Sequence, residues 1–313
     1  MDGFLVICKP KGMTSHDLVN KTRQKLSIKK VGHTGTLDPM ATGVLVLCIG
    51  KGTRFSQYLM GGKKTYEAEI VFGISTNTLD MDGEVLDETS SLHIETKCIE
   101  KALKTFKGNI TQIPPMVSAI KKNGVALYKL ARKGIEIDRE PRAVSIYNIE
   151  LLNSKIVDDK RIINITVTCS AGTYIRSLCE DLGKKLEIGA TLSKLHRSKN
   201  GTFSDNDSLL YEDFEEMKPD AVKNKILPLE ISANYLPAVN LDESKEEDMA
   251  CGREILLSEN EIKEIFKNKK AIEKENEVIK EMSNITCLAL INSQSSAIGI
   301  LEENIFKPKK VFI

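Results

Sequence analysis

The sequence predicts an α+β fold followed by a small β-rich region. Apolar stretches of strand and helix length mix along the first two thirds of the chain, without the strict alternation of a doubly wound parallel sheet. The composition shifts around residues 220–235, and short apolar stretches at 286–291 and 297–301 come after an acidic run. A chain of 313 residues is long enough for two domains. We expect one domain at 1–231 and a C-terminal domain at 232–313.

The elements expected first are a short buried strand at residues 4–8 and a helix that begins after Thr14. Thr14 and Asp17 have the spacing of a capping box, with Asp in the place of Glu or Gln. Residues 31–43 are rich in Gly and Thr and predict a loop. The apolar run at 44–49 predicts a strand that is buried on both faces.

Strict alternation predicts two further strands, one from Tyr66 to Phe72 and one from Arg161 to Ser170. A helix is expected between them at about 94–106, and another follows the second strand. Residues 111–142 break this pattern with a Pro-Pro pair and many cations, which predicts an exposed basic insertion. Its cations include Lys121, Lys122, Lys129 and Arg132.

The overall composition is that of a soluble globular protein, with 41% hydrophobic and 28% charged residues. No stretch reaches the ~20 apolar residues that span a bilayer, and the first residues lack the apolar run of a signal peptide. We therefore expect a cytoplasmic protein with no membrane partner. Seven cysteines without a CxxC pair argue against a disulfide framework and a structural zinc site.

Charge is distributed unevenly although the net charge is only +1. Residues 1–65 hold 11 Lys and Arg against 3 Asp and Glu, whereas residues 231–313 hold 11 against 15. A basic first fifth favours a surface that faces a polyanion.

The loop around Asp38 is the strongest chemical signal. Asp38 precedes Pro39, which favours an extended backbone, and Gly35 and Gly43 allow tight turns and close approach. A carboxylate thus lies on a shaped loop before a buried strand. Turn aspartates are common, so spacing alone leaves a structural role open.

Other chemistries fit the sequence poorly. Lys51 is followed by Gly52 where a P-loop needs Ser or Thr. An EF-hand in the Asp80 turn fails because Thr78 and Thr89 stand where carboxylates belong. The four histidines show no metal-ligand spacing. There is no GxSxG elbow, although sequence does not exclude a Ser or Cys triad.

The segment VGHTGTLDPMATGVL at residues 31–45 resembles the catalytic motif of the bacterial tRNA pseudouridine-55 synthases, the TruB family. The resemblance continues through further segments in the same order: Lys9–Ser15, Lys64–Glu67, Thr78–Gly83, Ile113–Lys121, Gly124–Arg132 and Cys169–Leu178. It implies a pseudouridine synthase fold with a mixed, mainly antiparallel central sheet and flanking helices. The C-terminal region would be a PUA-like RNA-binding domain, although its net negative charge is unusual for one.

The resemblance implies an isomerase that converts uridine 55 in the T loop of tRNA to pseudouridine. Asp38 would be the nucleophile, paired with Arg176, and Tyr66 would stack on the target base. The target uridine must be flipped out before its glycosidic bond can be reached. Whether Asp38 attacks C1′, attacks C6 or first removes a ribose proton stays open.

Substrate-binding roles are implied for His33, Tyr174 and Leu195, besides Tyr66. The reaction is redox-neutral, so we expect no cofactor and no metal. The basic insertion resembles the segment with which the family grips RNA, so RNA contacts are implied for Lys121, Lys122, Lys129 and Arg132. It resembles the stand-alone bacterial form, so we expect no obligatory protein partner and a monomer. A tRNA-binding folding helper and an RNA-guided enzyme within a complex are the alternatives.

Overall fold

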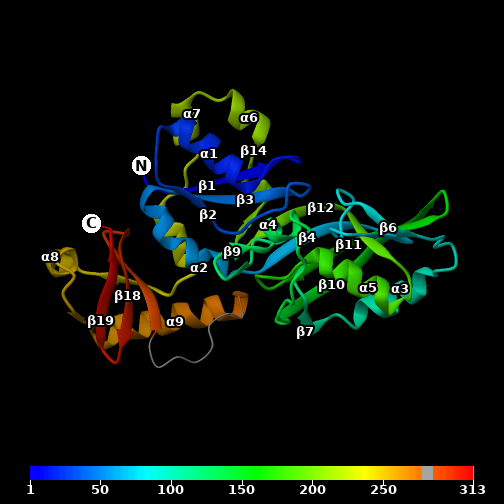
Figure 1. The fold of residues 1–313 in the computed structure, drawn as a ribbon. Coiled ribbons are helices and arrows are strands. Elements are labelled where there is room, and N and C mark those ends of the chain that lie inside the picture. Colours follow the sequence, from blue (N-terminus) through cyan, green and yellow to red (C-terminus); the bar gives the residue numbers. More distant parts are fainter. Residues whose placement is uncertain (277–284, 313) are drawn as a thin grey trace. The chain divides into compact units, whose positions relative to one another are not determined.

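The computed structural model describes residues 1–276 and 285–312. They form two compact units. The first unit contains residues 1–39, 43–62 and 200–313, and the second contains residues 40–42 and 63–199. Figure 1 shows that both units contain strands and helices.

The sheet of the first unit is built on β1 (Gly3–Lys9) and β3 (Thr42–Ile49), which pair antiparallel. Strand β2 (Val31–His33) pairs antiparallel with β3, and β14 (Leu209–Leu210) pairs parallel with β1. Almost every residue of β3 is buried. The continuous apolar run expected at residues 44–49 is therefore a strand covered on both faces. The loop expected at 31–43 begins with the short strand β2.

Helix α1 (Ser15–Leu26) follows β1, and its start is the predicted capping box. The Asp17 N–H donates to Thr14 Oγ1 at 3.1 Å, and the Thr14 N–H donates to Asp17 Oδ2 at 3.0 Å. These side-chain and backbone bonds from Thr14 lower the pKa of Asp17. The helix ends at Ser27, which adopts the left-handed conformation with φ of 54°.

The C-terminal sheet lies in the same unit and has the order β15-β17-β18-β19-β16. Its strands are β15 (Ala238–Leu241), β16 (Ile255–Leu256), β17 (Ile285–Ile291), β18 (Gln294–Glu302) and β19 (Ile305–Val311). Helix α9 (Glu259–Asn276) lies against β15, where Asn268 Nδ2 donates to the Ala238 carbonyl at 2.7 Å. The strands expected at 286–291 and 297–301 are both present.

One apolar core joins the two sheets of the first unit. Phe4 from β1 and Leu288 from β17 belong to the same buried cluster. The rings of Phe55 and Phe312 are stacked at 4.7 Å between centroids, with Phe55 next to the ring of Phe4. The C-terminal sheet therefore shares its hydrophobic stabilisation with the sheet that carries the Asp38 loop.

The sheet of the second unit has the order β12-β4-β11-β10-β7. Its strands are β4 (Lys64–Phe72), β7 (Gly108–Gln112), β10 (Arg142–Val157), β11 (Lys160–Cys169) and β12 (Ala190–Asn200). The alternation predicted for β4 and β11 is present, with Ile163, Ile165 and Val167 fully buried. Helices α3 (Thr96–Lys104) and α5 (Ile175–Lys185) lie against this sheet.

Two connections of the second unit bear on the site. A hairpin of β5 (Ile74–Thr76) and β6 (Val85–Glu88) follows β4. The basic insertion joins β7 to β10 and contains β8 (Lys121–Lys122), β9 (Val125–Ala126) and α4 (Leu127–Ala131). Its expected range of 111–142 includes the ends of both flanking strands, so the connection itself is residues 113–141.

Short elements complete the chain: η1 (Gly50–Phe55), α2 (Ser56–Met60), β13 (Phe203–Ser204), η2 (Asp205–Asp207), α6 (Tyr211–Glu216), α7 (Pro219–Lys223), η3 (Leu229–Asn234), η4 (Glu243–Lys245) and α8 (Glu246–Ala250). Parallel and antiparallel pairing occur together, and antiparallel pairing dominates. The predicted α+β fold with a mixed sheet is confirmed. In the part of the chain that the structure describes, no helix is both long and apolar enough to cross a membrane.

Candidate active site

The loop that carries Asp38 is anchored on its N-terminal side by Ser15, the first residue of α1. The buried Ser15 hydroxyl accepts the Leu37 N–H at 2.8 Å and donates to the Leu37 carbonyl at 3.1 Å. Both backbone groups of the residue before Asp38 are therefore fixed by one side chain. Asp38 itself is half-buried.

The C-terminal side of Asp38 is anchored at Pro39. Its carbonyl accepts the Gly12 N–H at 2.8 Å and also accepts from Lys9 Nζ at 3.4 Å. The fully buried Lys9 ammonium donates to the Met13 carbonyl at 2.8 Å as well. The segment after β1 and the Asp38 loop are thus tied together through backbone carbonyls, which fixes Asp38 without engaging its carboxylate in these bonds.

His33 lies at the start of the same loop, at the end of β2. Its Nδ1 accepts the Gly35 N–H at 3.2 Å, and Gly35 has a φ of +147°, which favours glycine. The next residue, Thr34, donates its N–H to the Val46 carbonyl at 3.1 Å. The structure therefore brings His33 and Asp38 into one anchored loop of the first unit.

The other predicted site residues belong to the second unit. Tyr66 is buried on β4, in register with Val167 of β11. Leu195 is buried on β12, the other neighbour of β4 in the sheet. Strand β11 leads directly to Tyr174, the N-cap residue of α5, and to Arg176 in its first turn. Sheet order thus groups these four residues around β4 and the start of α5.

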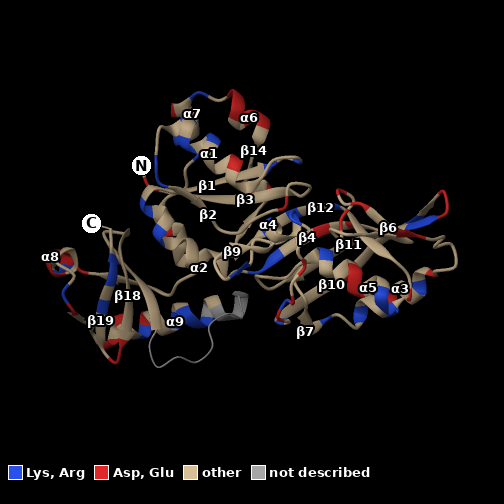
Figure 2. Ribbon diagram, in the orientation of Figure 1, with Lys and Arg blue, Asp and Glu red and all other residues tan. Residues whose placement is uncertain are grey.

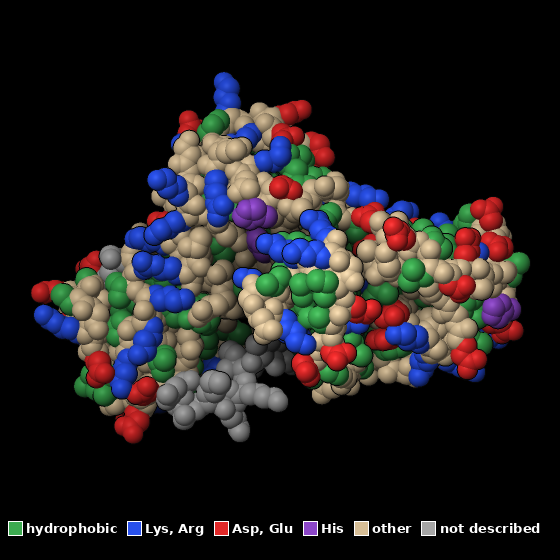
Figure 3. All heavy atoms as spheres, in the orientation of Figure 1, with side chains coloured by type: hydrophobic (Ala, Val, Ile, Leu, Met, Phe, Trp, Pro, Cys, Tyr) green, Lys and Arg blue, Asp and Glu red, His purple; other side chains and the backbone are tan. Residues whose placement is uncertain are grey.

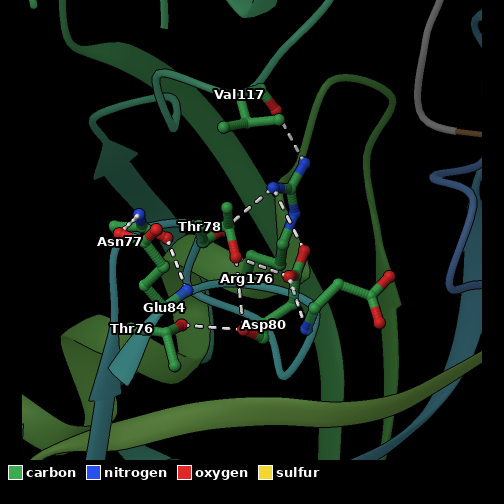
Figure 4. A network of polar contacts seen from close by, with 8 residues as sticks. Thr76, Asn77, Thr78, Asp80, Glu84, Val117 and Arg176 are labelled. Atoms are coloured by element: carbon green, nitrogen blue, oxygen red, sulfur yellow. Dashed lines mark hydrogen bonds and ion pairs between the residues drawn. The ribbon is translucent and has the colours of Figure 1, made fainter. Parts of the chain in front are cut away.

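Arg176 is held by a network of polar contacts that Figure 4 shows. Its buried guanidinium donates from Nη1 to the Thr78 carbonyl at 3.0 Å and from Nη2 to the Val117 carbonyl at 2.8 Å. Nη1 also lies 3.4 Å from Oδ2 of Asp80, whose side chain is 8% exposed. One guanidinium therefore ties α5 to the β5–β6 connection and to the insertion.

Asp80 is a charged partner that the sequence did not reveal. Its Oδ1 accepts from Thr78 Oγ1 at 2.6 Å and from the Asp82 N–H at 3.2 Å, so the carboxylate is fixed as well as paired. The available signal was its place in the segment Thr78–Gly83, where the spacing excludes a calcium loop. The predicted pairing of Arg176 with Asp38 joins residues of different units and stays a prediction.

Lys64 is a second residue that the sequence reasoning passed over. It is buried on β4, two residues before Tyr66 and on the same face. Burial, and then the charge of Arg197, lower the pKa of Lys64 to about 8. Alternation along β4 contained this signal, because it places a lysine on the buried side of the strand.

The candidate RNA-contacting residues of the insertion are on its surface. Lys121, Lys122, Lys129 and Arg132 are all exposed. Lys122 Nζ donates to the Asp138 carbonyl at 2.9 Å, and the Arg132 guanidinium lies 5.4 Å from the centre of the Tyr128 ring. Their accessibility is what a phosphate-contacting role requires.

The C-terminal sheet carries more positive charge locally than its net charge indicates. Lys307, Lys309 and Lys310 lie on β19 (Figure 2), whereas acidic residues gather in α8. Figure 3 shows a row of Lys and Arg side chains over this part of the surface. Lys310 Nζ donates to the Arg54 carbonyl at 2.8 Å, and burial followed by the Arg54 charge lowers the pKa of Lys310.

Metal-ligating side chains do not gather in the described part of the chain. Within residues 1–276 and 285–312, no group of three or more His, Cys, Asp or Glu side chains has an arrangement that could hold a metal ion. The site chemistry that the described residues offer is that of carboxylate, guanidinium and phenol groups.

Comparison with known proteins places this chain in a family. Residues 23–175 match the N-terminal domain of the TruB family pseudouridylate synthases, and residues 176–233 match the tRNA pseudouridylate synthase B C-terminal domain. The tRNA pseudouridine synthase B of Dehalococcoides mccartyi is 41% identical over 317 residues, which cover 100% of this chain and 97% of that protein. The tRNA pseudouridine synthase B of Clostridium perfringens is 45% identical over 243 residues, 78% of this chain and 81% of the relative.

Solved structures show the same fold at lower identity. An H/ACA RNP bound to a substrate RNA containing 2′-deoxyuridine matches with a TM-score of 0.69 and 23% identity, over 99% of this chain and 85% of that chain. A Cbf5-Nop10-Gar1 complex matches with a TM-score of 0.65 and 24% identity, over the same shares. The chain belongs to the TruB family of pseudouridylate synthases, which are isomerases.

Proposed function

We propose that the protein isomerises uridine 55 in the T loop of tRNA to pseudouridine. The observation that carries the proposal is the Asp38 loop, in which Ser15 and Gly12 fix the residues on both sides of the carboxylate. The family membership and the relatives that are named tRNA pseudouridine synthase B support the choice of reaction and RNA.

The reaction breaks the N1–C1′ bond, rotates the base and forms a C5–C1′ bond, after which C5 loses its proton and N1 gains one. Asp38 acts as the nucleophile on a uridine that is flipped out of the T loop. No electrons are exchanged and no phosphoryl group is transferred, so the chemistry balances without a redox or nucleotide cofactor. Water must be kept away from the detached base, because hydrolysis would release uracil.

The remaining site residues have supporting roles in this proposal. Arg176 stabilises the charge of Asp38, and Tyr66 stacks on the target base. His33, Tyr174 and Leu195 contact the substrate around it. The buried positions of Tyr66 and Leu195 on neighbouring strands are compatible with the wall of a nucleoside pocket.

The accessible cations of the insertion hold the RNA backbone in this proposal. Phosphate contacts would supply affinity that falls with salt and would carry little base identity. Residues 1–231 form the catalytic domain and residues 232–313 a PUA-like domain. The enzyme works in the cytoplasm as a monomer without an obligatory protein partner, since the insertion supplies RNA contacts within the same chain.

Purified protein incubated with an unmodified tRNA transcript tests the proposal. Mapping should find pseudouridine at position 55 and none in a transcript with cytidine there, without added protein or guide RNA. Pseudouridine only after accessory components are added would favour the RNA-guided alternative. Tight tRNA binding with no pseudouridine at any position would favour a folding helper.

A further inference from the structure

The start of α5 is fastened to the first residues of the insertion by a run of side-chain bonds. Gln112 is the last residue of β7, and its side chain is turned inward, with only 2% of the residue exposed. It contacts Tyr174, the N-cap of the helix that carries Arg176. The proposed reaction gives Gln112 no role.

Gln112 and Tyr174 form a reciprocal pair of hydrogen bonds. Gln112 Nε2 donates to the Tyr174 carbonyl at 3.2 Å, and the Tyr174 N–H donates to Gln112 Oε1 at 3.0 Å. The amide thus acts on Tyr174 as a neighbouring strand would, satisfying both of its backbone groups. Tyr174 is the N-cap residue of α5, and its carbonyl also accepts the Leu178 N–H at 3.1 Å, so these bonds hold the residue at which α5 begins.

The next residues of α5 continue the same attachment. Ser177 Oγ donates to the Ile113 carbonyl at 2.8 Å, and Arg176 Nη2 donates to the Val117 carbonyl at 2.8 Å. Three residues at the start of one helix, Tyr174, Arg176 and Ser177, therefore reach the segment 112–117. The exposed, cationic part of the insertion begins directly after residues 112–117, which we call the insertion root.

We propose that Gln112 is a positioning residue for the candidate active site. It sets the backbone of Tyr174, and through the first turn of α5 it aims the guanidinium of Arg176 at Asp80 and at the insertion root. RNA held by the insertion is thereby coupled to the arginine. This inference rests on the proposed function only in assigning Arg176 to the reaction.

The physical reason is that the contacts of Arg176 tolerate little displacement. The distance of 3.4 Å between Nη1 and Oδ2 of Asp80 is already at the long end for an ion pair. A shift of α5 by ~1 Å would break it, and misplacements of that size can lower rates by up to about 10²-fold. Without Gln112 the Tyr174 N–H loses its hydrogen bond, while the Tyr174 carbonyl keeps the bond from the Leu178 N–H at 3.1 Å, so the helix persists but its start is held less firmly to the insertion.

Gln112→Leu tests the proposal, with Ser91→Ala as the matched control. Ser91 is also fully buried and also makes one donated and one accepted bond with backbone, to the Phe72 carbonyl and from the Arg161 N–H. Gln112→Leu should lower the single-turnover rate at saturating T-stem-loop RNA by at least about tenfold while Kd changes less than about threefold. Ser91→Ala should lose comparable thermal stability and keep a rate within about twofold of wild type.

Hydrogen exchange without RNA supplies a readout that does not depend on activity. In Gln112→Leu the amides of Tyr174, Ile113 and residues 116–118 should exchange at least about tenfold faster, with the strands of the sheet still protected. Unchanged protection there overturns the proposal, as does a rate loss no larger than that of Ser91→Ala. A wild-type protein that makes no pseudouridine would refute the proposed function instead, while faster exchange would still establish the attachment.

Discussion

The loop around Asp38 is anchored through the backbone of its neighbours, whereas Arg176 is anchored through its own guanidinium. Leu37 and Pro39 form the bonds on either side of Asp38. The guanidinium, in contrast, bonds two carbonyls and lies beside the carboxylate of Asp80. The anchors described for Asp38 are thus backbone bonds of its neighbours, and those described for Arg176 are bonds of its own side chain.

Because of this difference, substitutions at Asp38 and at Arg176 should affect catalysis and stability differently. A substitution at Asp38 leaves the bonds of Leu37 and Pro39 in place, so the loop should keep its anchors while the reaction is lost. A substitution at Arg176 removes contacts that join α5, the β5–β6 connection and the insertion, so it should act on the reaction and on folding. Among substitutions outside Asp38, those at Arg176 should have the largest effect and those on the surface of the insertion the smallest.

Arg176→Met should have the largest effect. It leaves the carboxylate of Asp80 buried without this cation, and breaking such a pair from one side costs about 3–5 kcal/mol of unfolding free energy. The single-turnover rate should fall by at least about 10²-fold as well. Urea unfolding and single-turnover assays measure the two losses. Adding Asp80→Asn should restore part of the stability and none of the rate; recovery of the rate would show that Arg176 is only structural.

Lys64→Met should stabilise the protein at neutral pH. Burial lowers the pKa of Lys64 from 10.5 to about 8 in the folded state. Below pH 8 Lys64 is protonated in both the folded and the unfolded chain. Burying its ammonium then lowers the free energy of unfolding by up to about 3 kcal/mol. Between pH 8 and 10.5 the unfolded chain holds a proton that the folded chain lacks, so wild-type stability should rise relative to the variant.

Unfolding free energies of wild type and Lys64→Met, measured from pH 6 to 10.5, check this prediction. Lys63→Met serves as the control, since Lys63 is the preceding residue and its ammonium lies 4.4 Å from the centre of the Tyr147 ring. A stability difference between wild type and Lys64→Met that does not change with pH would contradict it.

Ser15→Ala should weaken the anchoring of the Asp38 loop, although Ser15 is not itself one of the proposed site residues. It removes both bonds to Leu37 and leaves a buried N–H unsatisfied, which costs about 1–3 kcal/mol. The rate at saturating RNA should fall by about tenfold because the carboxylate is less well placed. Thr22→Val, which removes one buried bond on the same helix, should lower stability and leave the rate unchanged. Equal rates in both variants would mean that the loop is positioned by other residues.

Charge reversal of Lys121, Lys122 and Lys129 should have the smallest effect, confined to binding. We expect Kd for tRNA to rise by about tenfold at 0.1 M salt, and the slope of log Kd against log salt to fall by about one for each phosphate that the variant no longer neutralises. The lysines of α3 provide a matched triple reversal: Lys97, Lys101 and Lys104. If both triples weaken binding equally, the effect comes from net charge rather than from the insertion.

Local patterns predicted most of the fold. The capping box at Thr14, the apolar run of β3 and the alternation of β4 and β11 all involve residues that are close in sequence. Strand β19 was not predicted, because Lys307, Pro308 and Lys309 interrupt any alternation of apolar and polar residues. It forms because β18 offers a pairing edge, with Ile300 in register with Lys307. Such pairing is set by tertiary context.

For the candidate site, the sequence indicated the motif residues but not their distant partners. Asp38, Tyr66 and Arg176 were identified from motifs, and the structure places each on the expected kind of element. Asp80 was missed because its partner lies almost a hundred residues away, and no local pattern says which cation a turn carboxylate will meet. Gln112 was missed for the same reason.

Asp38→Asn tests the central claim most directly, because it removes the charge of one side chain and retains its shape. Wild type and variant should bind a T-stem-loop RNA with Kd values within about threefold and unfold at the same urea concentration, while pseudouridine formation falls by at least about 10³-fold. A variant that keeps a tenth or more of the wild-type rate, or that loses folding and RNA binding together with activity, would contradict the role of Asp38 as nucleophile.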